Sequence, residues 1–102
     1  MHVISRPILD TFSDKHPPAR TPLETWWKLA RRAKWKSLQD VRMDRPEADG
    51  VTLASGKVLT VFNIGGNKYR LVALVDYRFN KVFVYHILTH AEYDRGAWKD
   101  QS

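Results

Sequence analysis

The chain of 102 residues contains no cysteine. It can therefore form neither disulfide bonds nor thiolate metal sites, which is compatible with a reducing cytosol. No run of apolar residues approaches the roughly 20 residues needed to span a bilayer, and residues 1–7 lack the long apolar core of a signal peptide. We therefore expect a cytoplasmic protein without a membrane segment.

Acidic residues are the scarcer charged type. The chain holds 11 Asp and Glu against 17 Lys and Arg, a net charge of +6. Residues 20–45 alone contain eight basic and three acidic side chains, so most of the excess charge lies there. Such a balance favours a polyanionic partner. The length and a hydrophobic content of 43% are typical of one compact domain, which we place over residues 1–102.

The first half of the chain has a helical period. Residues 2–4 are a short strand candidate, after which Ser5 can cap a helix that ends at Pro17-Pro18. A second start is clearer, because Thr21 provides an N-cap hydroxyl, proline follows at the first helical position, and Glu24 lies at the third. Both features predict helices, and a third, shorter one begins at Ser37 and closes before Pro46.

The helix that begins at Thr21 is amphipathic and basic. Its apolar residues follow the i, i+3, i+4, i+7 rule and include Leu23, Trp26, Trp27, Ala30 and Ala33. The two tryptophans are therefore expected in the core and not as base-stacking platforms. Its cationic residues Lys28, Arg31 and Arg32 lie away from this stripe. They are either a solvated surface or the contact for an anionic partner, and their one-sided charge favours the partner.

Beyond Pro46 the period becomes strand-like. Candidate strands cover residues 51–53, 58–64, 69–77 and 82–89, with turns between them. Both faces of the longer strands are largely apolar, as in central strands covered by helices on one side and partly covered on the other. We therefore predict an α+β domain with an antiparallel meander. Gly96 is expected to end a short C-terminal turn, and residues 98–102 are expected to form a loose tail.

A diglycine turn, Gly65-Gly66, joins two of these strands. Glycine supplies the positive φ angles of a tight hairpin. Four polar or cationic side chains crowd around it, namely Asn63, Asn67, Lys68 and Arg70. Turn formation is the stronger explanation for the glycines and asparagines, whereas the two cations are also suited to gripping an anion.

Alternation along the strands supplies candidate catalytic residues. It places Arg70 and Lys68 together on one face of their strand, and it places His90 on one face of the last strand together with Val82, Val84, His86 and Leu88. Tyr93 follows His90 by one helical turn. A base, an acid and a phosphate clamp are what RNA cleavage by an attacking 2′-hydroxyl requires.

Ordinary alternatives exist for each of these residues. A histidine at a strand end is usually a surface or capping residue, and Arg70 has Asp76 and Asp94 as alternative ion-pair partners. Metal catalysis is poorly supported, because His86 and His90 are four residues apart on a predicted strand, about 13 Å, and no acidic cluster is present. We therefore predict neither a metal nor a cofactor.

Several motifs resemble the HigB family of type II toxins over nearly the whole chain. They are residues 1–5 (MHVIS), Trp35-Lys36, residues 61–71 (VFNIGGNKYRL) and residues 89–94 (THAEYD). The resemblance implies a RelE-like fold, in which N-terminal helices pack on a twisted antiparallel sheet and a short helix follows it. It also implies an mRNA interferase that cuts without a metal, commonly on the ribosome. The implied partner is a HigA-like antitoxin with a helix-turn-helix.

By this resemblance, Arg70 with Lys68 beside it clamps the scissile phosphate, His90 transfers a proton, and Tyr93 shares that task or stacks on a base. The RNA contacts are expected at Asn63, Asn67, Lys28, Arg31, Arg32 and Lys36. Two other classes stay open at this stage, a noncatalytic RNA-binding module and a gyrase inhibitor like the related ParE toxins.

Overall fold

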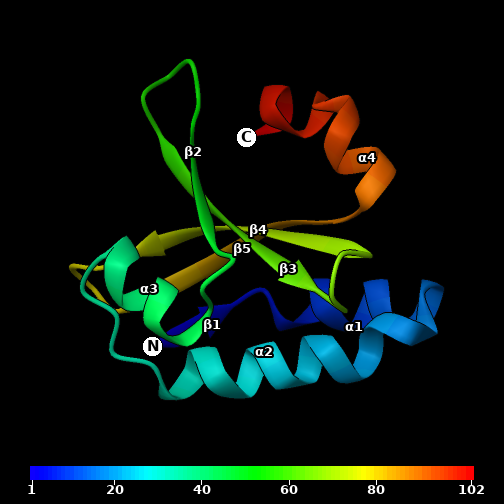
Figure 1. Cartoon of the computed structure of the whole chain (residues 1–102), viewed down its shortest axis with the longest axis horizontal. Helices are drawn as coiled ribbons and strands as arrows, with labels where there is room; N and C mark the ends of the chain where they lie inside the picture. The colour runs from blue at the N-terminus through cyan, green and yellow to red at the C-terminus, as the bar shows by residue number, and fades with distance from the viewer.

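The structure, a computed structural model, describes all residues 1–102 (Figure 1). Its elements are β1 (His2–Ile4), α1 (Arg6–Lys15), the 3₁₀ turn η1 (Pro17–Ala19), α2 (Arg20–Arg32), α3 (Leu38–Asp44), β2 (Asp49–Thr52), β3 (Val58–Ile64), β4 (Tyr69–Asp76), β5 (Lys81–Thr89), α4 (His90–Arg95) and the 3₁₀ helix η2 (Ala97–Gln101). The α+β class is confirmed. None of the helices is both long and apolar enough to cross a membrane.

The five strands form one sheet in the order β1-β5-β4-β3-β2. Strands β2 to β5 are the predicted antiparallel meander. Strand β1 instead pairs parallel with β5, so the sheet is mixed and not wholly antiparallel. The helices and the strands β2 to β4 all lie between β1 and β5 in the chain, so the connection is much longer than the dozen or more residues that a parallel pair requires.

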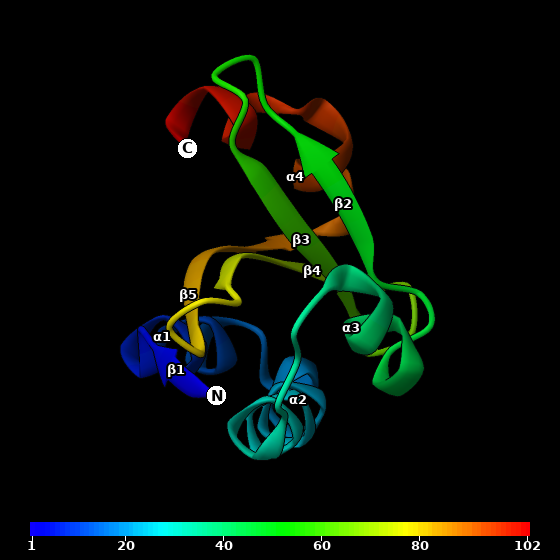
Figure 2. The same cartoon turned by 90° about the vertical axis from the view of Figure 1, so that its left-hand side faces the viewer.

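Helices α1 and α2 pack under one face of the sheet, which we call the lower face (Figures 1 and 2). The larger core, 18 buried residues, lies there. At its centre the ring of Phe62 contacts Trp26, edge to face at 5.4 Å between centroids, and Trp35, stacked at 6.0 Å. Trp26 is completely buried, which confirms its predicted place in the core.

Helices α4 and η2 lie against the opposite, upper face, over a smaller core of Leu53, Leu59, Val61, Val72 and Trp98. The prediction of a loose tail is wrong. Trp98 is only 3% exposed, its Nε1 donates to the carbonyl of Tyr93 at 3.1 Å, and Ser102 Oγ lies 2.8 Å from His86 Nε2. Burial of the large indole ring on the sheet holds this segment in place.

The predicted capping box at Thr21 is also wrong. Helix α2 begins at Arg20 as a continuation of η1, with Ala19 at the N-cap position and no side-chain cap. Because the chain is already helical there, Thr21 falls inside the first turn, and Glu24 pairs instead with Arg6 at 2.7 Å. Ser5 does precede α1, but with φ 86 and without a side-chain cap bond.

Two other helices have the side-chain caps that α2 lacks. Ser37 caps α3 as predicted, accepting from the amide of Asp40. A complete capping box opens α4, where Thr89 Oγ1 accepts from the Glu92 amide at 3.2 Å and Glu92 Oε1 accepts from the Thr89 amide at 2.9 Å.

An irregularity in β5 changes which side chains share a face. Val72 pairs with His86 and Ala73 with Val84, which leaves Tyr85 as an extra residue in β5. A β-bulge of this kind reverses the alternation beyond it. Val82 and Val84 consequently belong to the lower core, whereas Leu88 packs on the upper one. The prediction that these residues share one face with His86 and His90 is therefore wrong.

Candidate active site

The diglycine turn forms the β3–β4 hairpin as predicted. Gly65 and Gly66 have φ angles of 64 and 70, a conformation that side chains rarely adopt. The hairpin register places Asn63 directly opposite Arg70, and both alternate with lower-core residues, so both project from the upper face. Lys68 lies in the turn itself, exposed and just before β4.

The guanidinium of Arg70 is held by the turn and has no carboxylate partner. It donates to Asn67 Oδ1 at 2.5 Å, to the Asn67 carbonyl at 3.3 Å and to the Tyr69 carbonyl at 3.1 Å. The alternative ion pairs with Asp76 and Asp94 do not occur. Its charge is thus oriented but not neutralised, and a guanidinium in this state is suited to binding a phosphate. Asn67 orients this arginine.

His90 opens α4 at the same end of the sheet. Its amide donates to the carbonyl of Lys68 at 3.0 Å, which joins α4 to the residues just before β4. Its Nδ1 lies 2.9 Å from Asp94 Oδ2, and its side chain is 44% exposed. A carboxylate at Nδ1 fixes the ring and leaves Nε2 free to exchange a proton with a substrate.

Tyr93 connects this end of the sheet to the upper core. Its ring stacks on Trp98 at 5.3 Å, and the Arg70 guanidinium carbon lies 5.7 Å from the ring centroid. Burial raises the pKa of the Tyr93 phenol, and the carboxylates of Asp49 and Asp94 add to this while Arg70 opposes it. The phenol therefore keeps its proton at neutral pH and can donate it.

Sequence reasoning missed two carboxylates at this site. Asp94 appeared only as a possible partner of Arg70, although its i, i+4 spacing from His90 within a short capped helix was a usable signal. Asp49 gave no signal at all, because it comes from β2, far from the other residues in sequence. The structure contains no group of three or more His, Cys, Asp or Glu side chains able to hold a metal ion.

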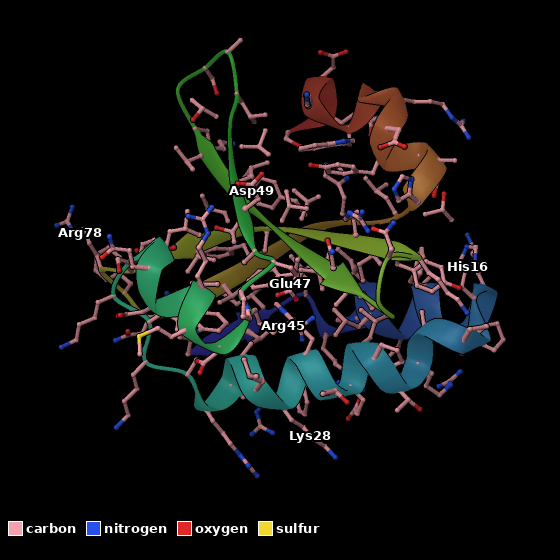
Figure 3. The ribbon with its side chains drawn as sticks, in the orientation of Figure 1. His16, Lys28, Arg45, Glu47, Asp49 and Arg78 are labelled. Carbon is pink, nitrogen blue, oxygen red and sulfur yellow. The ribbon has the colours of Figure 1, made fainter.

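The predicted basic contacts lie elsewhere. Lys28, Arg31, Arg32 and Lys36 are all exposed. They belong to α2 and the residues just after it, and Figure 3 shows Lys28 extending from α2 away from the sheet. We call these four residues the basic α2 surface, and its Lys28 points away from α4. The structure brings Asn63 and Asn67 to Arg70, but it does not bring the basic α2 surface to the same place.

The fold and the residues at its end define a class of protein. The mixed sheet, with helices on its lower face and a short capped helix after its last central strand, is a RelE-like fold. Residues 19–96 match the family described as "HigB_toxin, RelE-like toxic component of a toxin-antitoxin system". The chain belongs to this HigB toxin family, and as the toxic component of such a system it has an antitoxin as its partner.

Known relatives are similar over most of their length. The "mRNA interferase toxin HigB" of Escherichia coli (strain K12) is 29% identical over 94 residues, which cover 92% of this chain and 88% of the relative. The "mRNA interferase HigB" of Escherichia coli O6:H1 (strain CFT073) is 26% identical over 95 residues, 93% of this chain and 90% of the relative. The resemblance inferred from the sequence motifs is therefore confirmed.

Proposed function

We propose that this toxin is an endoribonuclease that cleaves mRNA and thereby blocks translation. Family membership and the names of the relatives support this function. The observation that carries it is the unneutralised guanidinium of Arg70 against Tyr93, at the end of the sheet where His90, backed by Asp94, opens α4.

In the proposed reaction the 2′-hydroxyl attacks the neighbouring phosphorus. Nε2 of His90 accepts the hydroxyl proton, and Arg70 stabilises the charge that develops on the phosphoryl oxygens, with Lys68 adding positive charge. The bond from phosphorus to the 5′-oxygen breaks, leaving a 2′,3′-cyclic phosphate. Tyr93 donates its phenolic proton to the departing oxygen, which as an alkoxide is far more basic than a phenolate.

The basic α2 surface is assigned to a second contact. We propose that it binds the phosphate backbone of ribosomal RNA, while the opposite side of the toxin takes the mRNA. Replacing Lys28 and Arg32 by glutamate should then weaken ribosome binding and flatten its dependence on salt, with no loss of cleavage of free RNA. The proposal places the toxin in the cytoplasm, with a HigA-like helix-turn-helix protein as its antitoxin.

The test is cleavage by purified toxin, freed of antitoxin, in a translating extract, with the cut sites mapped by primer extension. His90→Ala should lower the cleavage rate about 100-fold or more without a change in melting temperature. His2→Ala is the matched control, because His2 is exposed on the edge strand β1. Wild-type cleavage by His90→Ala would remove the assigned base. If the wild-type toxin binds mRNA but leaves it intact, an RNA-binding module is favoured. If it causes DNA damage and leaves mRNA intact, a gyrase inhibitor is favoured.

A further inference from the structure

Asp49 projects from the upper face beside the candidate active site. It opens β2 and pairs with Val61, which belongs to the upper core. The next residue, Gly50, faces the lower side, where a Cβ would lie 3.3 Å from Leu38 of α3. Figure 3 shows Asp49 above β4 and β5, on the same side of these strands as α4. It therefore shares a face with Arg70 and Tyr93.

The carboxylate of Asp49 is held in place through one of its two oxygens, and the other oxygen has no partner. Its Oδ1 accepts from Arg42 Nη2 at 3.2 Å and from the Gly50 amide at 3.0 Å. Arg42 is itself fixed, because its Nε donates to the Ala48 carbonyl at 2.9 Å. The second oxygen, Oδ2, has no hydrogen-bond partner in the protein, and the side chain is 70% exposed. A fixed acceptor with a free oxygen is available to a ligand.

A second free polar group lies next to it. Asn63 is two residues beyond Val61 on β3, on the same face, and such diagonal neighbours are about 7–8 Å apart. The backbone carbonyl of Asn63 accepts from Arg45, and its side-chain amide has no hydrogen-bond partner in the protein. Asp49, Asn63 and Arg70 thus form a row across three adjacent strands. The effect of Asp49 on the pKa of Tyr93 agrees with this proximity.

The chemistry of the row changes along its length. Arg70 at one end suits a phosphate, whereas the carboxylate of Asp49 at the other end, which forms an ion pair with Arg42, accepts hydrogen bonds only. Adenine, cytosine and guanine each carry an exocyclic amino group that donates to a carboxylate, and the amide of Asn63 can donate to a ring nitrogen beside it. Uracil instead presents two carbonyl oxygens around a single N–H, and these oxygens repel a carboxylate.

We propose that Asp49, together with Asn63, reads the base next to the scissile phosphate and favours bases with an exocyclic amino group over uracil. This inference rests on the proposed function. It assigns a specificity role to a residue outside the proton-transfer and phosphate-binding machinery.

The test uses transcripts that differ only in the base beside one mapped cleavage site. Wild-type toxin should cut the uracil version about 5- to 150-fold more slowly, judged by kcat/KM, than the versions with an amino-bearing base. Asp49→Asn should cut this difference to about threefold or less, chiefly by slowing the amino-bearing sites. Asn63→Ala should relax it as well. Asp14→Asn, an exposed aspartate on α1, is the matched control and should keep the full difference.

Each other outcome overturns the inference. Equal cleavage of all four transcripts by the wild type would remove the base preference. If Asp49→Asn keeps the full discrimination between bases, Asp49 has no part in the base preference. If Asp49→Asn loses the same share of kcat/KM at all four bases, Asp49 is a structural residue. If the wild type cleaves no transcript, the proposed function itself fails, which is distinct from cleavage without discrimination.

Discussion

Replacement of Arg70 is the sharpest test of the proposed active site. Arg70→Ala removes two hydrogen bonds to Asn67 in the turn, one to the Tyr69 carbonyl and the contact with the Tyr93 ring. The side chain is half-buried and makes no ion pair, so we expect a loss of about 1–2 kcal/mol in unfolding free energy. For a domain of this size each kcal/mol lowers the melting temperature by about 4–8 °C, so the variant should stay folded.

The expected effect on catalysis is larger. A preorganised donor that stabilises transition-state charge is worth about 100- to 1,000-fold in rate, or about 2.7–4 kcal/mol, and Arg70→Ala should lose this much in kcat/KM. Arg70→Lys keeps the charge but not the planar fork that Asn67 and Tyr69 orient. The kcat/KM of Arg70→Lys should therefore lie between those of the wild type and Arg70→Ala, about tenfold below the wild type.

The assay is primer-extension kinetics on one transcript, with thermal melting of each variant in parallel. Arg78→Ala is a matched control, because the guanidinium of Arg78 also lies over an aromatic ring, that of Phe79 at 5.6 Å. It is in the β4–β5 turn at the end of the sheet away from α4 (Figure 3). Equal activity of Arg70→Ala and Arg78→Ala would refute the phosphate role, as would a loss of activity explained by unfolding alone.

Three further predictions concern the residues around α4. Asp94→Asn removes the carboxylate that orients His90, so cleavage should fall about 10- to 100-fold with a changed pH–rate profile; an unchanged profile would contradict the orienting role. Trp98→Ala should cost about 3–5 kcal/mol of unfolding free energy, whereas Trp98→Phe, which keeps the stack on Tyr93, should cost about 1 kcal/mol; equal melting temperatures for the wild type and the alanine variant would disprove the anchoring of the C-terminal segment. The hydrogen bond from the Thr89 amide lowers the pKa of Glu92 from 4.5. Because the pKa of Glu92 is lower in the folded protein, its contribution to stability is fully present above about pH 4.5 and is lost as the pH falls through the folded pKa. The Glu92→Gln variant should therefore melt at a lower temperature than the wild type at pH 7 and should lose less stability on acidification.

Local patterns predicted most elements well. The strand and turn signals around Gly65-Gly66 placed β3 and the start of β4 correctly, and Pro17-Pro18 ended α1 where expected. The helix stripe correctly put Trp26 in the core. The failure at Thr21 has a local cause as well, since a preceding 3₁₀ turn removed the need for a cap.

Sequence motifs also indicated the family, which the comparisons confirm, and they supplied the candidate site residues. Arg70 and Tyr93 were named from them, and the structure brings these two into contact. The alternation of residues along a strand could not predict the bulge at Tyr85. One extra residue in β5 leaves no mark on a period-2 pattern whose two faces are both apolar, yet it decides which face carries His86 and Leu88.

The rest was decided only in three dimensions. The register of β2 against β3 brings Asp49 to the face of Arg70 across 21 residues of sequence, and the packing of α2 under the lower face directs Lys28 away from that site. Most of the helices and strands, the charge and the family follow from the sequence alone, because they depend on neighbouring residues and their spacing. Which side chains meet depends on strand register and on the face that each helix covers, and these follow from burial of the whole core at once.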